Sequence, residues 1–419
     1  MKMSKMGIKT RHHRGEDEAL SQEILFQATQ LKRHAAGIYG LGNLLVRARN
    51  NIMNIIRKNL EDYECSEVSL PVIQPKSLWE ASGRWDTYTQ NNQMFTFEGR
   101  NGEYCLAPTG EEIVLDFVKE NIASYKDLPI NIFQIGNKYR DEIRVRGGLL
   151  RSKEFSMKDG YSFHATKEDM VREYNAMKEC YCKIFSELGL NAIAVKAVSA
   201  DMGGKVSEEF MCPSPVGEDK VLMDEKSGIA LNTEVLEYPE MLAEIKNNNP
   251  DFDPENLKEV QCIELGHIFQ LGKFYSENMN GYFVNSEGKK EPYYMGCYGI
   301  GVNRALGAIC ENNCDNEGLI WPESVAPYKC VIVPTPDNLQ QSEDLYSKLK
   351  SKGIDTVWDD RNATLGSKIK DAKLLGFPYM IIVGKKFVSD GLFEVEVRKT
   401  GEKLFVNFDE LVKLMSFKK

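Results

Sequence analysis

Apolar residues recur at helical spacing in the first part of the chain. Residues 16–63 are therefore expected to be helical, and the apolar stripe of their second part is Leu45, Ile52, Met53, Ile56 and Leu60. Residues 68–72 then alternate in polarity, which predicts a strand. Because Pro71 cannot donate a hydrogen bond within a sheet, this strand suits an edge or an interface better than a sheet centre.

The middle of the chain is predicted to alternate strands with two helices. Thr109 is the expected N-cap of the first helix, and a loop rich in glycine and arginine, 144–151, joins two antiparallel strands. The acidic stretch 238–258 is rich in Asn and Pro, which indicates a surface linker. The expected strands lie within 130–163 and at 192–198, 219–231, 261–271, 281–285 and 291–298, and the helices at 111–119 and 166–188.

The pattern changes after residue 322. Buried-looking strands at 329–333, 354–358 and 379–384 alternate with helices at 339–352 and 366–375. This alternation is typical of a small α/β domain with a mainly parallel sheet. We therefore place a domain boundary between residues 322 and 323.

Composition limits the class of protein. No run approaches the roughly 20 apolar residues of a membrane span, and the basic N-terminus lacks the apolar segment of a secretory signal, so we expect a cytoplasmic protein. The ten cysteines and five histidines do not show zinc-ligand spacing, and no structural zinc is expected. A net charge of −9 argues against indiscriminate binding of nucleic acid, although residues 326–419 carry a small basic surplus.

Two clusters point to nucleotide chemistry. Arg140 and Glu142 are expected on one face of a strand, where an arginine can clamp a phosphate and a carboxylate can accept from an adenine amino group. Phe155 on the return strand could stack on the base. Farther on, glycines at 296–301 precede Arg304 in the first turn of a helix, and that arginine could reach a phosphate. A solvated ion pair and an ordinary glycine turn are the alternatives.

Taken together, the clusters resemble the three signature motifs of class II aminoacyl-tRNA synthetases. The stretches Arg140–Arg144, Arg151–Phe163, Gly266–Gly272 and Met295–Val302 resemble prolyl-tRNA synthetase of the bacterial type. The resemblance implies an α+β fold, with a class II catalytic domain (an antiparallel sheet flanked by helices) over 1–322 and a C-terminal α/β anticodon-binding domain over 323–419. It also implies a homodimer that uses the region around Pro71.

The resemblance further implies a proline–tRNA ligase that activates L-proline with ATP and transfers it to tRNA(Pro). Arg140 and Arg304 would be catalytic, stabilising charge on the phosphates, and Glu264 would hold Mg²⁺ that comes with ATP. The full ATP-binding set would be Arg140, Glu142, Arg151, Phe155, Glu264, Gly301 and Arg304.

Proline would be recognised through its ammonium group and its apolar ring. Thr109 and Glu111 can accept the two N–H donors, and Gly110 stands where the family usually has a larger residue. The full proline-binding set would be Thr109, Glu111, Arg140, Met157, His267, Phe269 and Cys297. For Met157 and Phe269 plain core packing is the alternative, and for His267 a structural role.

Contacts with tRNA are expected in both domains. Arg144 and Arg146 in the hairpin loop would meet the acceptor end, with a solvated basic loop as the alternative. In the C-terminal domain arginine and aspartate side chains can read base edges in a single-stranded loop. The expected anticodon residues are Asp360, Arg361, Lys368 and Lys370, although the lysines could equally be helix-surface charges.

The editing insertion that bacterial-type prolyl enzymes commonly carry is absent. Only the stretch 238–258 lies between its flanks and Glu264. Rejecting alanine, which is smaller than proline, by binding alone is worth only about 1–3 kcal/mol. We therefore expect alanine mischarging and correction by a separate trans-editing protein.

Three alternatives remain open at this stage. A threonyl-type sister enzyme would need a zinc site in its pocket. A paralogue could pass activated proline to a carrier protein or a small molecule. A non-catalytic RNA-binding regulatory subunit would be free to lose Arg140, Glu142 or Arg304, and all three are present.

Overall fold

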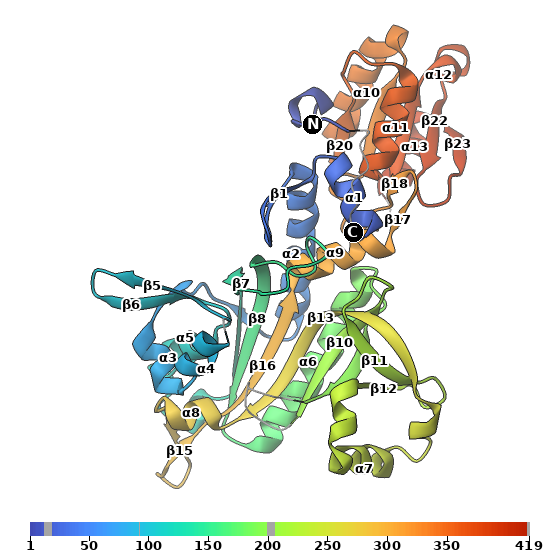
Figure 1. The fold of residues 1–419 in the computed structure, drawn as a ribbon. Coiled ribbons are helices and arrows are strands. Elements are labelled where there is room, and N and C mark those ends of the chain that lie inside the picture. The colour runs from blue at the N-terminus through green and yellow to red at the C-terminus, as the bar shows by residue number, and fades with distance from the viewer. Residues whose placement is uncertain (12–18, 92, 199–205, 417–419) are drawn as a thin grey trace. The chain divides into compact units, whose positions relative to one another are not determined.

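The computed structural model describes residues 1–11, 19–91, 93–198 and 206–416, which form two compact units. The large unit comprises Ala36–Ile38 and Met53–Ala308. The small unit comprises Met1–Ala35, Tyr39–Ile52 and Ile309–Lys419. Each is described by itself (Figure 1).

A twisted sheet forms the centre of the large unit (Figure 1). In the described residues it has nine strands, and all pairs are antiparallel except β3–β7 and β9–β12. The predicted antiparallel architecture is therefore confirmed. The strands in spatial order are β10 (Val206–Pro213), β9 (Ile193–Ala197), β12 (Ile229–Asn232), β11 (Asp219–Asp224), β13 (Lys258–Gly272), β16 (Tyr294–Gly301), β8 (Glu154–His164), β7 (Ile130–Tyr139) and β3 (Ser66–Glu67).

Helix α6 (Lys167–Glu187) covers one face of this sheet across β8, β16 and β13. One apolar stripe of this helix is buried, as the 3.6-residue period of the segment predicts; it consists of Met170, Tyr174, Met177, Cys180, Tyr181, Ile184 and Phe185. Lys158 in β8 points to this face, since its Nζ donates to the hydroxyl of Tyr181 (3.0 Å) in α6. The odd-numbered residues of β8 consequently face the other side of the sheet.

The remaining elements of the large unit surround the sheet. A three-stranded sheet lies beside helices α3 to α5, and a hairpin follows α8. Their bounds are β4 (Ile73–Pro75), β6 (Gly102–Leu106), β5 (Phe95–Gly99), β14 (Tyr282–Val284), β15 (Lys290–Pro292), α3 (Lys76–Ser82), α4 (Trp85–Gln90), α5 (Glu111–Val118), α7 (Pro239–Asn248), α8 (Phe274–Asn278), η2 (Tyr125–Asp127), η4 (Thr233–Glu237) and η5 (Pro254–Asn256).

The small unit contains a five-stranded sheet whose first three strands are parallel, as predicted. The two antiparallel strands β22 and β23 were not predicted. Its elements are β20 (Thr356–Trp358), β19 (Cys330–Pro334), β21 (Tyr379–Val383), β22 (Phe393–Val397), β23 (Lys403–Val406), α10 (Leu339–Ser351), α11 (Leu365–Leu375), α12 (Lys385–Asp390), α13 (Phe408–Ser416), β17 (Cys314–Asp315), β18 (Gly318–Leu319), α1 (Leu20–Gln27), η1 (Met3–Lys5) and η6 (Pro336–Asn338).

The expectation of helices throughout 16–63 is only partly correct. Helices α1 and α2 (Asn43–Asp62) are present, but the hairpin of β1 (Leu31–Ala35) and β2 (Ile38–Leu41) separates them. Gly37 makes the turn, with a φ of +72° that glycine adopts without strain. Residues 16–18 of the predicted range lie outside the described residues.

The predicted strand over residues 68–72 is wrong. The chain there lies between β3 and β4, and Pro71 separates two short paired segments. Proline lacks the N–H that a continuous ladder would need at this point. The segment is instead held by isolated hydrogen bonds, including the one from the Val68 N–H to the Phe133 carbonyl (2.8 Å).

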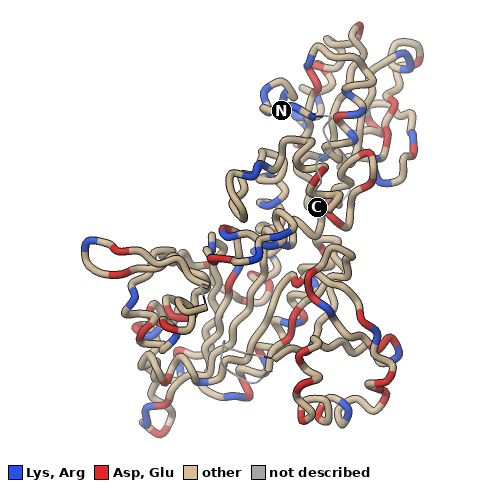
Figure 2. The backbone as a smooth tube through the Cα atoms, viewed as in Figure 1, with Lys and Arg blue, Asp and Glu red and all other residues tan. Residues whose placement is uncertain are grey.

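The interpretation of 238–258 as a surface linker is also wrong. The segment folds as α7 and η5, and Ile245 and Phe252 pack with Leu231 and Val235 in a small core. Acidic residues recur in and around α7 (Figure 2), and they separate the few apolar residues that form this core.

The compact units divide the chain elsewhere than the predicted boundary at 322/323. Met3 and Met6 are buried against Val331 and Val357 of the small-unit sheet, so the N-terminal residues belong with the C-terminal module. Helix α9 (Val302–Asn312) contributes residues to both units. In the described part of the chain, no helix is long and apolar enough to span a bilayer.

Candidate active site

A cavity of about 710 Å³ opens on the face of the large sheet that α6 leaves free. Odd-numbered residues of β8 form its floor, from Phe155 to Tyr161. The segment between β7 and β8, the start of α5, and strands β13 and β16 supply the walls. Every residue that lines it belongs to the large unit.

The cavity brings together all of the catalytic, ATP and proline candidates. Arg144 also lines it, whereas Arg146 is not a lining residue and forms a backbone bridge with Arg151. The predicted residues that line the cavity are Thr109, Glu111, Arg140, Glu142, Arg144, Arg151, Phe155, Met157, Glu264, His267, Phe269, Cys297, Gly301 and Arg304.

Arg304 is held in the first turn of α9 by three acceptors. Its Nε donates to the Leu150 carbonyl (3.1 Å), and one terminal nitrogen donates to the backbone (3.0 Å) and the carboxylate (2.6 Å) of Glu264. The expected position of Arg304 at the start of the helix is thus correct. An arginine fixed in this way presents its charge to the cavity with little freedom left to lose.

Arg140 and Glu142 lie just beyond the end of β7, and the prediction that they share a strand face is wrong. The Glu142 N–H donates to the Arg140 carbonyl (2.8 Å), so the chain turns there. Both side chains still reach the cavity. The Arg140 guanidinium carbon lies 5.4 Å from the Phe155 ring centre, and the Glu142 carboxylate accepts from Arg151 Nε (2.9 Å).

The glycine-rich segment at 296–301 is part of strand β16, so the predicted turn is wrong. Gly299 and Gly301 face the cavity, whereas Gly296 faces the opposite side. A Cβ on Gly299 would come within 2.7 Å of the Met157 methyl group. Because these glycines have no side chains, this wall of the cavity leaves more room for a ligand.

Glu111 is the most deeply buried carboxylate of the cavity. It is 0% exposed and accepts from the Thr109 hydroxyl (2.6 Å) and the Cys297 thiol (3.4 Å). Thr109 does not cap α5; the N-cap is Gly110, without a side-chain bond. Burial alone would raise the pKa of Glu111, but the charge of Arg84 holds it below its ordinary value.

Gly110 is required by its surroundings. Its N–H donates to the Tyr161 hydroxyl (3.0 Å), and a Cβ there would lie 2.6 Å from a carboxylate oxygen of Asp159. Asp159 is itself paired with Lys138 (3.0 Å). The small residue thus lets the backbone approach the floor of the cavity.

Carboxylates and an imidazole gather at the other end of the cavity. His267 Nδ1 lies 3.6 Å from Glu264 and 3.7 Å from Glu209, and its ring stacks on Phe269 at 3.8 Å. Burial and the charge of Glu264 raise the pKa of Glu209 to about 7. Ligand atoms of these three residues lie within 4.8 Å of one another, an oxygen-rich set that fits a hard divalent cation.

Several functional candidates were missed by sequence reasoning. Glu112 and Arg84 join Glu111 in one network, and Asp159, Tyr161 and Glu209 stand in or beside the cavity. Asp159 and Tyr161 follow Met157 at strand spacing, which was a usable signal. Strand β10, which carries Glu209, was not predicted.

The anticodon candidates of the small unit differ in exposure. Arg361 is engaged by Asp359 (2.7 Å) and Asp371 (2.8 Å), and the buried Lys368 donates to the Asp359 carbonyl (3.1 Å). Lys370 is exposed. The carboxylate of the remaining candidate, Asp360, accepts from the N–H (2.8 Å) and hydroxyl (2.6 Å) of Ser4.

Comparison with protein families agrees with the fold. Residues 95–313 match the tRNA synthetase class II core domain (G, H, P, S and T), and residues 329–418 match an anticodon binding domain. The fold is therefore that of a class II aminoacyl-tRNA synthetase.

Relatives that match over almost the full length show which family of class II synthetases this chain belongs to. The proline–tRNA ligase of Sulfurimonas denitrificans is 36% identical over 437 residues, which covers 99% of this chain and 100% of that protein. The chain belongs to the proline–tRNA ligase family and is an aminoacyl-tRNA ligase, as the sequence motifs predicted. A crystal structure of prolyl-tRNA synthetase from Cryptosporidium parvum, complexed with halofuginone and AMPPNP, has the same fold. It is 17% identical, with a TM-score of 0.76 over 94% of this chain and 76% of that one.

The relatives also differ in length. The proline–tRNA ligase of Persephonella marina is 32% identical, and the match covers 94% of this chain and 96% of that protein. Its alignment runs over 543 positions, whereas this chain has 419 residues. That relative therefore contains a long stretch without a counterpart here.

Proposed function

We propose that the cavity binds ATP and L-proline side by side and forms prolyl-adenylate. A proline carboxylate oxygen attacks the α-phosphorus, the bond to the bridging oxygen breaks, and pyrophosphate leaves. A ribose hydroxyl of the terminal adenosine of tRNA(Pro) then attacks the carbonyl carbon and AMP leaves. The observation that carries the proposal is that Arg140 and Arg304, far apart in the sequence, line one cavity with Glu111.

Catalysis here consists of positioning and charge stabilisation. Arg140 binds the α-phosphate and the proline carboxylate, and Arg304 binds the γ-phosphate. Glu142 and Phe155 take the adenine, and Arg151 takes a phosphate. Arg151 forms ion pairs with Glu142 and Glu218. When ATP binds, Arg151 exchanges these carboxylate partners for a phosphate.

The amine and the ring of proline are recognised by opposite kinds of surface. Thr109 and Glu111 accept from the secondary ammonium, whose charge matches the buried carboxylate. The apolar ring contacts a lining of sulfur-containing and aromatic side chains. These side chains face the cavity, which a role in core packing alone would not require. This lining consists of Met157, His267, Phe269 and Cys297.

Mg²⁺ enters with ATP as part of the substrate. The carboxylate of Glu264 is the ligand that we assign to it, and Glu209 and His267 lie close enough to contribute. Mg²⁺ neutralises phosphate charge when bound. Glu264 raises the proton affinity of the buried Glu209, and a divalent ion between the two carboxylates would relieve this repulsion.

Binding of tRNA uses both units. Arg144 and Arg146 contact the acceptor end, and the surface of the small unit that reads the anticodon is built from Asp360, Arg361, Lys368 and Lys370. Arg361 and Lys368 have partners within the unit, so they act on RNA by holding the surface in shape. Lys370 is exposed and would contact a phosphate.

We further propose that the enzyme acts in the cytoplasm as a homodimer, with the region around Pro71 at the interface. A C₂ dimer is also the commonest oligomer of soluble proteins. Because the long stretch of the Persephonella relative has no counterpart here, the enzyme releases Ala-tRNA(Pro) uncorrected. A separate trans-editing protein hydrolyses it.

ATP–pyrophosphate exchange over a panel of amino acids, followed by charging of tRNA(Pro), tests these assignments. We expect exchange with proline and weaker exchange with alanine. Arg140→Ala and Arg304→Ala should each lower proline-dependent exchange by about 10²–10³-fold. Arg172→Ala is the matched control, because that side chain is 73% exposed on α6.

Each failure has a distinct meaning. Exchange without charging would indicate the carrier paralogue, and absence of exchange the regulatory subunit. Hydrolysis of Ala-tRNA(Pro) by the purified enzyme would refute correction in trans.

A further inference from the structure

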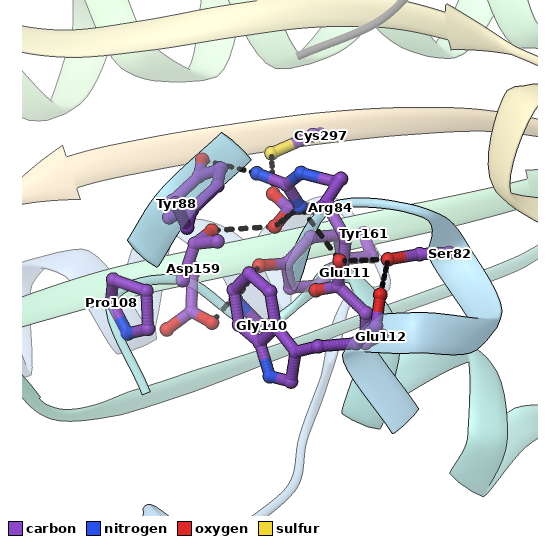
Figure 3. A network of polar contacts seen from close by, with 12 residues as sticks. Ser82, Arg84, Tyr88, Pro108, Gly110, Glu111, Glu112, Asp159, Tyr161 and Cys297 are labelled. Carbon is purple, nitrogen blue, oxygen red and sulfur yellow. Dashed lines mark hydrogen bonds and ion pairs between the residues drawn. The ribbon is translucent and has the colours of Figure 1, made fainter. Parts of the chain in front are cut away.

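A buried ion-pair network adjoins the end of the cavity that holds Glu111 (Figure 3). One terminal nitrogen of Arg84 donates to Glu111 (3.3 Å) and to Glu112 (2.9 Å). Both carboxylates are 0% exposed and Arg84 is 4% exposed. Glu111 lines the cavity, whereas Arg84 and Glu112 do not. One guanidinium therefore serves two carboxylates, and only one of them faces the ligand.

The guanidinium is fixed from several sides. Its carbon lies 4.5 Å from the ring centre of Tyr88, 5.3 Å from that of Trp79 and 5.4 Å from that of Tyr275. Aromatic faces favour a cation at such distances. Arg84 directly follows Gly83, whose φ of +78° ends α3 and turns the chain toward the network. The position of Arg84 is thus set by its surroundings as well as by the two carboxylates.

Glu112 is anchored independently. The Ser82 hydroxyl donates to the same carboxylate oxygen that accepts from Arg84 (2.8 Å). Glu111 and Glu112 are the first two residues of α5, where the helix dipole favours negative charge. Burial raises the pKa of Glu112 above its ordinary value; the charge of Arg84 opposes this shift and that of Glu111 adds to it. The other carboxylate of the cavity floor, Asp159, has its own partner in Lys138 (3.0 Å).

We propose that Arg84 and Glu112 are positioning residues for Glu111 that make the pocket selective for a cationic amine. The guanidinium fixes the direction of the Glu111 carboxylate. Glu112 balances the guanidinium, so that Glu111 keeps its negative charge available to the substrate ammonium. Without Glu112, Arg84 would neutralise Glu111 and oppose the incoming cation. This inference rests on the proposed role of Glu111 in binding proline.

The variant Glu112→Gln tests the charge directly. The amide oxygen can still accept from Ser82 and Arg84, so a purely structural role predicts unchanged kinetics. We expect the KM for proline in pyrophosphate exchange to rise about ten-fold, as the loss of one charge a short distance away implies. The KM for ATP and the kcat should change little. Inhibition by cyclopentanecarboxylate, which lacks the amine, should not weaken.

Glu80→Gln is the matched control, since Glu80 is an exposed residue of α3. An unchanged KM for proline in Glu112→Gln would overturn the inference, as would equal weakening of proline and cyclopentanecarboxylate. Should that variant not fold, Arg84→Lys applies the same test, because a point charge cannot hold both carboxylates as the planar group does. An unchanged KM there would likewise overturn it.

Glu111→Gln separates the inference from the function it rests on. If this variant retains the KM for proline, the proposed role of Glu111 fails. If Glu111→Gln raises the KM and neither Glu112→Gln nor Arg84→Lys does, only the positioning role fails.

Discussion

Two glycines of β16 show how residues of one type serve opposite faces of the sheet. Gly299 faces the cavity and leaves the space beside the Met157 side chain open. Gly296 points to the α6 side, where a Cβ would lie 2.7 Å from the Ser162 hydroxyl and closer still to that of Tyr298. Those two hydroxyls bond to each other (2.8 Å). The glycine at 296 thus leaves room for a buried hydrogen bond.

Gly296→Ala should therefore destabilise the large unit by about 1–3 kcal/mol, because a well-packed layer must move to admit a methyl group. Chemical denaturation followed by tryptophan fluorescence would measure the loss. Gly136→Ala in β7 is the control, since a Cβ there meets nothing within 4 Å. Equal stability of the two variants would contradict this account of Gly296.

The residues of the cavity were predictable where a motif or strand period pointed to them. Arg304 and Glu111 stand in long motifs, and the structure places both in the cavity. Arg84 was not found, because a lone arginine after glycine has no periodic signal, and only tertiary packing brings it to α5. Glu209 was missed because the strand that carries it, β10, was not predicted.

At the scale of elements, an irregularity of β13 decides the shape of the site. The pairing of β10 with β13 shifts between Phe210 and Met211, so that Leu265 has no partner. Such a bulge turns the following side chains over. Glu264 and His267 therefore face the same cavity, although an odd spacing would place them on opposite faces of a regular strand. Sequence periodicity cannot reveal such a shift.

Long amphipathic elements were the predictable ones. Helix α6 spans Lys167–Glu187, against an expected 166–188. The prediction for the segment that contains α7 was wrong because its apolar residues are few and separated by acidic ones. Its core is nevertheless closed, with Phe252 only 1% exposed.

Phe252→Ala should consequently cost about 3–5 kcal/mol of stability in the large unit, through lost burial and the cavity left behind. Thermal and urea denaturation would report it. Leu236→Ala serves for comparison, because that side chain is 47% exposed in the neighbouring η4. If both substitutions were equally mild, the segment would be the linker that its composition indicated.

At the scale of the whole molecule, sequence reasoning found the two modules but assigned the N-terminal residues to the wrong compact unit. The α/β alternation after residue 322 predicted β19 to β21 with their helices. The first residues lack a long amphipathic period, so nothing in them indicated a partner. Met3 is nevertheless 2% exposed and Met6 9% exposed, both in the core beneath the small-unit sheet.

This arrangement predicts that a change near the N-terminus separates the two halves of the reaction. The double variant Met3→Ala/Met6→Ala should destabilise the small unit, at about 2–5 kcal/mol for a fully buried methionine. Charging of tRNA(Pro) should fall because anticodon recognition needs that unit. Proline-dependent pyrophosphate exchange should persist, since all residues lining the cavity belong to the large unit. Lys5→Ala, at an exposed position between them, should leave both activities unchanged. Loss of exchange in parallel with charging would mean that adenylate formation depends on the small unit after all.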